Sequence, residues 1–519
     1  MDRKIIIGSR GSDLALWQAN HTFRRLRKIG IDSEIKIIKT QGDNIQNLSF
    51  EKLEGKGFFT KEIEDALLNK EIDLAVHSHK DLPTESPEGL IIAAVSERED
   101  PADMLLIRKE CVDASQPLNC KSNAIVGTSS PRRKSQLLAF RKDIQIEDLR
   151  GNVPTRIQKL RDKKYDAIML ATAGVERLNI NLSEFKVLRL DPKEFVPAPA
   201  QGVLGLQIRA NDHELFEQVL KLNSEKVAST IAVERKILNM FDGGCQLPLG
   251  SYCIKEKGLY KVWASKSNDW KNSPSRIYLQ ASSEKGLAEK VVNQFNNIDA
   301  KPVLITRDLD ENSYFQNTLK ANKYEVHPIS FIETKSIPFN DITATNWIFF
   351  ASGNAVKHFF SQNPTLNGKL KYGVIGKSTE KELKKFNKNA AFVGMINDTK
   401  VVGKKFAKTV GDESVLFPQA EKGLNTIQKQ FKNQDKLHNL PVYKTTKKEE
   451  ITIPEFKVIV FTSPSNVEAF FQLGGELKEK QVVAIGKSTE KKLASFGVEN
   501  CTVPPAYDEV ALTAAVFGI

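Results

Sequence analysis

Residues 61–83 read KEIEDALLNKEIDLAVHSHKDLP, and this stretch indicates the fold class. Apolar side chains recur at helical spacing from Lys61 to Leu68, and the apolar run from Ile72 to Val76 is typical of a buried strand. The same alternation lies upstream, as a predicted strand, helix and strand at residues 4–7, 14–26 and 33–39. Strands that alternate with helices predict an α/β fold with parallel layers.

A second set of alternating elements extends from Met104 to Leu190, with predicted strands at residues 124–126, 145–148 and 167–170. The segment from Glu194 to Gln207 contains VPAPAQG, which is too rich in Pro and Gly for the interior of a helix or strand. It is typical of a hinge between two lobes, and a hinge of this kind predicts a cleft. Residues 212–297 then predict a small α+β domain.

Length and composition restrict the class of protein. A chain of 519 residues is too long for one core and predicts about three to five domains. The net charge of +12 favours an anionic partner, but the arginines form no basic run with interleaved aromatics, so a small polyanion is expected rather than nucleic acid. No apolar run approaches a membrane span or a signal core, so we expect no membrane partner and a cytoplasmic location.

The five cysteines have no Cys-x-x-Cys spacing, which fits neither a disulfide framework nor a zinc site. His77 and His79 have no further spaced ligands, and no metal site is predicted. Cys245 differs from the other cysteines because it lies in GGCQLPLGS, a loop sequence that would present a thiol as nucleophile or covalent anchor. The alternative is a small buried side chain.

Arginines lie at the predicted ends of strands throughout the first half. Each alone would be expected to form a surface ion pair. Together, at the cleft edge of two lobes, they predict a site that binds several carboxylates. These residues are Arg10, Arg132, Arg133, Arg150, Arg156 and Arg177.

Asp81 lies in HSHKDLP, the segment that directly follows the strand predicted at residues 72–76, and would be an acidic group at the mouth of an otherwise basic cleft. A carboxylate there could stabilise a developing cation or move a proton. The alternative is an ordinary turn or capping residue.

An internal repeat organises the C-terminal part. IGKSTEKEL at residues 375–383 returns as IGKSTEKKL at residues 485–493, an offset of about 110 residues that predicts two similar α/β lobes. The GKS triplets are not phosphate loops of nucleotide hydrolases, because that motif needs a glycine where this chain has Lys371 and Gln481. A strand-to-helix turn with a free helix N-terminus explains them better.

The motifs GSRGSDLAL, GKGFFTKE, HSHKDLP, GTSSPRR, LRGNVPTR, PAPAQG and GGCQLPLGSY occur in this order over about 250 residues. In this combination the chain resembles porphobilinogen deaminase, also called hydroxymethylbilane synthase. The resemblance implies a dipyrromethane cofactor held by Cys245 in a thioether and a catalytic carboxylate at Asp81. His79, Pro131 and Pro199-Ala200 depart from the family pattern at the cofactor turns and the hinge.

The resemblance also assigns binding residues. Those implied to bind the cofactor, besides Cys245, are Ser78, Lys80, Asp81, Thr128, Ser130, Arg132, Arg133, Arg150 and Arg156. Those implied to bind substrate, including three at the active-site lid, are Arg10, Ser12, Gln18, Lys52, Lys56, Phe59, Arg177 and Gln201.

The C-terminal part resembles uroporphyrinogen-III synthase through Thr306-Arg307, LPVYKT at residues 440–445, paired Ser-x-Asn-x-Val turns and the IGKST turns. The resemblance implies ring closure of hydroxymethylbilane without a cofactor and makes Tyr443 a proton donor to the departing hydroxyl. The alternative is that Tyr443 only begins a strand between lobes. The residues implied to hold substrate carboxylates are Ser352, Asn354, Ser463, Ser465 and Thr489.

We therefore expect a two-lobed α/β deaminase, like periplasmic binding proteins in fold, followed by a small α+β domain and a two-lobed α/β synthase module. The expected product is uroporphyrinogen III, made from porphobilinogen through hydroxymethylbilane by a monomer. Alternatives are a degenerate C-terminal scaffolding domain or a non-catalytic anion-binding protein. The expected first lobe of the deaminase is 1–103 completed by 197–215, the second lobe is 104–196, and the small α+β domain is 216–297. The synthase module is expected at 300–519. One of its lobes would combine 302–333 with 451–519, and the other would be 337–442.

Overall fold

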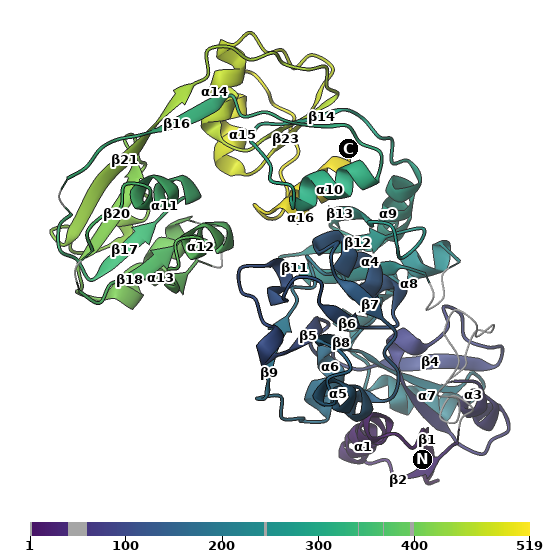
Figure 1. Ribbon diagram of the computed structural model, residues 1–519. Helices are drawn as coiled ribbons and strands as arrows, with labels where there is room; N and C mark the ends of the chain where they lie inside the picture. The colour runs from purple at the N-terminus through teal and green to yellow at the C-terminus, as the bar shows by residue number, and fades with distance from the viewer. Residues whose placement is uncertain (1–2, 40–59, 243–246, 341, 367, 395–398) are drawn as a thin grey trace. The chain divides into compact units, whose positions relative to one another are not determined.

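The computed structural model describes residues 3–39, 60–242, 247–340, 342–366, 368–394 and 399–519 (Figure 1). The chain forms two compact units. The first unit comprises Met1–Ala300, Asp310–Glu325 and Glu509–Ile519, and the second comprises Lys301–Leu309 and Val326–Asp508. In the described part of the chain, no helix combines the length and the apolar character needed to span a membrane.

The first sheet of the first unit has the strand order β2-β1-β3-β10-β4. Its strands are β1 (Ile5–Ser9), β2 (Ser33–Ile37), β3 (Leu74–Ser78), β4 (Leu90–Val95) and β10 (Leu204–Arg209). Its helices are α1 (Asp13–Lys28), α3 (Lys61–Leu68) and α7 (His213–Leu220). β10 is antiparallel to β3 and β4. The sheet is therefore mixed, whereas the sequence predicted parallel strands. The chain re-enters this sheet from the second lobe through β10, which reverses the strand direction.

The second sheet has the order β7-β6-β8-β5-β9 and is also mixed. Its strands are β5 (Asp103–Arg108), β6 (Ile125–Gly127), β7 (Gln145–Glu147), β8 (Ala167–Ala171) and β9 (Phe185–Arg189). Its helices are α4 (Pro131–Phe140), α5 (Val153–Arg161) and α6 (Thr172–Arg177). The three strands predicted here from the sequence are confirmed to within one residue at each end.

An antiparallel sheet completes the first unit, with β11 (Leu249–Glu256), β12 (Leu259–Lys266) and β13 (Ser275–Ala281) in sequence order. Its helices are α8 (Glu225–Met240) and α9 (Leu287–Asn296). Two helices from later in the chain, α10 (Tyr314–Ala321) and α16 (Glu509–Phe517), belong to the same unit, and α16 contacts β13. Glu509 accepts hydrogen bonds from the Ser313 hydroxyl at 2.9 Å and the Phe315 amide at 3.0 Å, so it caps α10.

The second unit contains a parallel sheet of order β15-β14-β22-β23. The strands are β14 (Val303–Ile305), β15 (Val326–Pro328), β22 (Val458–Phe461) and β23 (Gln481–Ala484), followed by α14 (Pro464–Gln472) and α15 (Lys487–Ala494).

Its other sheet has the order β16-β21-β20-β17-β18-β19, in which β16 alone among these strands runs antiparallel. The strands are β16 (Ile332–Ser336), β17 (Trp347–Phe350), β18 (Lys371–Val374), β19 (Ala390–Val393), β20 (Val415–Ala420) and β21 (Leu437–Lys447). The helices are α11 (Gly353–Phe360), α12 (Lys377–Lys384) and α13 (Thr399–Val410).

The sequence repeat corresponds to a structural repeat. Ser352 and Ser463 cap α11 and α14, and each hydroxyl accepts a hydrogen bond from the amide three residues later. Gly376 and Gly486 precede α12 and α15 with nearly identical extended backbones, φ −177° and −176°. The two GKST segments are therefore strand-to-helix turns, as the sequence predicted.

Candidate functional site

Asp81 lies in the short helix η2 (His79–Asp81), directly after β3, and its side chain is exposed. The segment is held in place from two sides. The Ser78 hydroxyl accepts a hydrogen bond from the Gln18 amide at 2.9 Å, and Lys80 donates to Gln201 Oε1 at 3.2 Å. Because Gln201 lies in the hinge segment, the Lys80 contact connects the strand end to the hinge.

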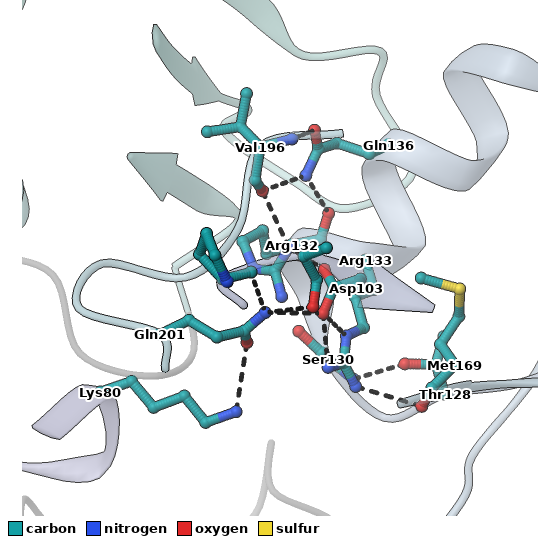
Figure 2. A network of polar contacts seen from close by, with 12 residues as sticks. Lys80, Asp103, Thr128, Ser130, Arg132, Arg133, Gln136, Met169, Val196 and Gln201 are labelled. Carbon is teal, nitrogen blue, oxygen red and sulfur yellow. Dashed lines mark hydrogen bonds and ion pairs between the residues drawn. The ribbon is translucent and has the colours of Figure 1, made fainter. Parts of the chain in front are cut away.

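A buried carboxylate, Asp103, organises the arginines at the start of α4 (Figure 2). Arg132 Nη1 donates to Asp103 Oδ2 at 2.7 Å, and Arg133 Nη2 donates to Asp103 Oδ1 at 2.7 Å. Gln201 Nε2 donates to the same Oδ1 at 3.0 Å. Burial would raise the pKa of Asp103, but the charges of Arg132 and Arg133 outweigh it and hold that pKa well below its usual range.

Arg132 and Arg133 are themselves buried and make further contacts with backbone carbonyls. Arg132 donates to Val196 O at 2.9 Å and Arg133 to Met169 O at 3.2 Å. Asp103 was not among the residues singled out from the sequence. A carboxylate directly before the apolar run MLLI of β5 could have indicated it, because such a group is seldom buried without a cation.

Three cations interact electrostatically with Asp81. Burial lowers the pKa of Lys80 to about 8, and Asp81 acts in the opposite direction. Burial and the charge of Arg133 lower the pKa of Arg156 to about 10, again opposed by Asp81. Burial also lowers the pKa of Arg177, with Glu99 and Asp81 opposing it. These couplings place three positive charges near the exposed carboxylate of Asp81, which follows β3.

The other predicted residues of the first unit have structural partners as well. Ser12 caps α1, Thr128 is buried and accepts a hydrogen bond from the Ser130 amide at 3.3 Å, and Arg177 donates to Glu99 at 2.6 Å. Arg10 and Arg150 are half-buried. Four predicted residues lie outside the described part of the chain: Lys52, Lys56, Phe59 and Cys245.

The predicted residues of the second unit fall on two sheets. The Tyr443 hydroxyl lies 3.3 Å from the Ser352 hydroxyl, so β21 and the start of α11 bring these two together. Asn354 is exposed in the first turn of α11. Ser463 caps α14, Ser465 is exposed beside it, and Thr489 is fully buried in α15.

Two lobes with mixed sheets, joined by a Pro- and Gly-rich segment and carrying arginines and a lysine near Asp81 and Asp103, are features typical of proteins that bind anionic ligands. Residues 5–217 match the family model "Porphobilinogen deaminase, dipyromethane cofactor binding domain", and residues 315–514 match "Uroporphyrinogen-III synthase HemD".

Similar proteins agree with the first match. The porphobilinogen deaminase of a Nitratiruptor species is 47% identical over 247 residues, which cover 48% of this chain and 77% of the relative. That of Maridesulfovibrio salexigens is 44% identical over 277 residues, 53% of this chain and 88% of the relative. Uroporphyrinogen-III synthetase from Helicobacter pylori is a structural neighbour with 17% identity and a TM-score of 0.33, covering 42% of this chain and 98% of that one.

The chain belongs to the porphobilinogen deaminase family and also carries a uroporphyrinogen-III synthase domain. It is a bifunctional enzyme of tetrapyrrole biosynthesis, and its first family domain is one that binds dipyrromethane. This membership decides against a non-catalytic anion-binding protein.

Proposed function

We propose that the first unit joins four porphobilinogen molecules head to tail into hydroxymethylbilane and that Asp81 is its catalytic carboxylate. The observation that carries the proposal is the set of three cations coupled to Asp81. Each pyrrole brings two carboxylates, so the cations would hold the acetate and propionate groups. Asp81 would hold the pyrrole N–H of the incoming substrate and stabilise the positive charge that develops as ammonia leaves.

Dipyrromethane fits this environment, because its carboxylates match the excess of cations near Asp81. Bound, it supplies the primer pyrrole to which the chain is added. Cys245 would carry it in a thioether. The other four cysteines suit this role poorly, since burial raises the pKa of every one of their thiols, that of Cys120 to about 12.

Intact mass spectrometry of the purified full chain tests the anchor. We expect an added mass equal to a dipyrromethane, lost in Cys245→Ala and retained in the matched variant Cys501→Ala. Asp81→Asn should keep the added mass but turn over porphobilinogen at least about 100-fold more slowly, the usual range for loss of a catalytic acid or base. A wild-type chain with no added mass would contradict the assignment of Cys245.

The second unit, we propose, closes hydroxymethylbilane to uroporphyrinogen III with Tyr443 as proton donor to the departing hydroxyl. The hydrogen-bonding distance between Tyr443 and Ser352 supports this role. Ser352, Asn354, Ser463, Ser465 and Thr489 are proposed to hold substrate carboxylates. The other candidate, a catalytically degenerate scaffolding domain, predicts that the full chain adds nothing to spontaneous closure.

Freshly made hydroxymethylbilane supplied to the full chain separates these two candidates. An active domain should yield the III isomer, whereas spontaneous closure yields the wrong isomer. Tyr443→Phe should then lower kcat by about 100-fold. If wild type and boiled enzyme give the same isomer ratio, the scaffolding alternative holds.

Finer domain boundaries also belong to the proposal: residues 1–103 with 197–215, then 104–196, 216–297 and 300–519. The three sheets of the first unit support the first three ranges, because each sheet draws its strands from one of them, except that β5 begins one residue earlier, at Asp103. The fourth range differs from the compact units, since Asp310–Glu325 and Glu509–Ile519 belong to the first unit. We further propose that the enzyme acts as a monomer in the cytoplasm. Sedimentation velocity at micromolar concentration would check the monomer by its mass, 58.1 kDa.

A further inference from the structure

His358, on the buried side of α11, makes polar contacts with both of its ring nitrogens. Nδ1 lies 2.8 Å from the Ser336 hydroxyl and Nε2 lies 2.8 Å from the Thr334 hydroxyl. Both hydroxyls come from β16, the strand that pairs with β21. The imidazole is therefore hydrogen-bonded to one strand at two points, which restrains its position and its ring plane.

The same ring lies against Tyr443. The two ring centroids are 5.3 Å apart and the planes are inclined by 18°, a stacked arrangement. Ser336 is also the register partner of Tyr443 across the β16–β21 pair. Stacking restrains the plane of the phenol, and the contact with Ser352 restrains its hydroxyl. Together these contacts determine where the Tyr443 oxygen lies.

The structural repeat provides an internal comparison. Counting from the capping residues Ser352 and Ser463, the position of His358 in α11 corresponds to Ala469 in α14. Ala469 is buried, as His358 is, so packing at this position of the repeat does not require an imidazole. The remaining buried residues of α11 are apolar: Ala355, Val356, Phe359 and Phe360.

Burial and the charge of Lys357 lower the pKa of His358, so the ring is neutral at physiological pH. A neutral imidazole has one N–H donor and one acceptor nitrogen. One of the two hydroxyls must therefore accept from the ring and the other must donate to it. The hydrogen bonds of the Thr334–His358–Ser336 chain therefore run in one of two directions, set by the tautomer of the ring.

We infer that His358 is a positioning residue for ring closure, which acts by holding the phenol of Tyr443 at the orientation in which it meets the substrate. The inference rests on the proposed role of Tyr443. His358 touches no substrate in this scheme, and its effect passes entirely through Tyr443. A residue that positions a reacting group should change kcat and leave substrate binding nearly unaltered.

Kinetics of the full chain on hydroxymethylbilane test the inference. His358→Ala introduces the residue that the other copy of the repeat has at this position, Ala469. It should lower kcat for uroporphyrinogen III by about 10- to 100-fold, because misplacing a reacting group by about 1 Å has an effect of this size. KM should stay within about twofold. His438→Ala, the same change on β21, is the matched control and should leave both constants unchanged.

The double variant separates this inference from the proposed function. If His358 acts through Tyr443, His358→Ala should cause no further loss in a Tyr443→Phe background. Losses that multiply, or an unchanged kcat in His358→Ala, would overturn the inference and leave the role of Tyr443 intact. Full activity of Tyr443→Phe would overturn both.

A measurement independent of activity gives a second check. With ring-labelled tyrosine, the resonance that disappears in Tyr443→Phe identifies Tyr443, and it should shift in His358→Ala because the stacked imidazole is gone. Thermal unfolding monitors folding. If His358→Ala unfolds below the assay temperature, His358→Phe replaces it, since a flat ring keeps the packing but lacks both nitrogens. An unmoved resonance in a folded His358→Ala chain would overturn the inference. For His358→Phe, whose ring can still stack on Tyr443, the readout is kcat, and an unchanged kcat would overturn it.

Discussion

Asp103 holds Arg132 and Arg133 in a place from which water is excluded, so its charge should matter to the stability of the first unit. Asp103→Asn would leave two buried guanidinium groups without their counter-charge. Removal of one member of a buried ion pair costs about 3–5 kcal/mol. We expect a fall of this size in the free energy of unfolding, measured by urea denaturation at pH 7.

The control is the pH dependence of the stability that Asp103→Asn loses. The folded pKa of Asp103 is depressed, so its stabilisation is fully present above the unfolded value of about 3.9 and is lost as pH falls through the folded pKa. The difference between wild type and Asp103→Asn should therefore shrink below about pH 4. A difference that stays constant down to pH 2 would show that the charge is not responsible.

Lys80 gives a prediction in the alkaline range. Its pKa of about 8 means that the ammonium is charged at pH 7 and mostly neutral at pH 9. If it holds a carboxylate, KM for porphobilinogen should rise by about 3- to 10-fold between these pH values. Lys80→Arg should remove the rise, because a guanidinium stays charged. An identical profile in Lys80→Arg would assign the titration to another group.

Sequence reasoning found Arg132 and Arg133 because they lie at a predicted strand-to-helix junction, and it named Lys80 through the family resemblance. It missed Asp103, since the carboxylate lies 29 residues from Arg132 in the chain and only the folded sheet brings them together. It named Tyr443 through a resemblance, but it did not identify His358. A histidine within the helical pattern GNAVKHFF gives no sign of the strand hydroxyls that it will meet.

At the scale of elements, the strand predicted at residues 72–76 is observed at Leu74–Ser78. Just before the observed strand, the Asp73 carboxylate accepts a hydrogen bond from the Ile6 amide at 3.0 Å and one from Arg209 at 2.7 Å. The Asp73 amide also donates to the Ile6 carbonyl at 2.9 Å, so backbone and side chain of Asp73 both contact β1. Hydrophobic periodicity does not register such contacts, and it does not reveal the antiparallel direction of β10.

The two capping serines, Ser352 and Ser463, form a matched pair. Either change to alanine should lower the free energy of unfolding of the second unit by about 1 kcal/mol, the usual effect of losing an N-cap. Ser352→Ala should also lower kcat for ring closure, because Tyr443 loses its hydroxyl partner, whereas the proposed loss of a carboxylate contact in Ser463→Ala should raise KM and leave kcat nearly unchanged. Thermal unfolding and initial rates measure the two effects. Equal losses of kcat in both variants would deny Ser352 a special role.

At the scale of the molecule, the repeat predicted two similar lobes, but it did not predict the partners of α10 and α16. The sequence of α16, EVALTAAVF, is apolar nearly all round, and such a helix is buried on every side. Periodicity therefore gives it no preferred face and no indication of its neighbour. In the structure both helices belong to the unit formed by residues 1–300, so the chain crosses between the units four times.

Because of these crossings, the benefit of fusion is better tested with point variants than with separated halves. An equimolar mixture of Asp81→Asn and Tyr443→Phe chains contains both active domains, but never on one molecule. Hydroxymethylbilane must then diffuse between chains, and it can close spontaneously to the wrong isomer on the way. In the wild type, tethering keeps the second domain at an effective concentration that dilution does not change, of the order of millimolar for short flexible connections.

We therefore expect the III to I isomer ratio from porphobilinogen to fall with dilution in the mixture and to stay constant in the wild type. Chromatography of the oxidised porphyrins, at equal concentrations of each active domain, measures the ratio. A mixture of wild type with the double variant controls for total protein. The isomer ratios of the mixture and the wild type should differ most below micromolar enzyme, where hydroxymethylbilane takes longest to reach a second chain. Identical ratios at every dilution would mean that hydroxymethylbilane leaves the chain before it is closed, and that fusion has no kinetic effect.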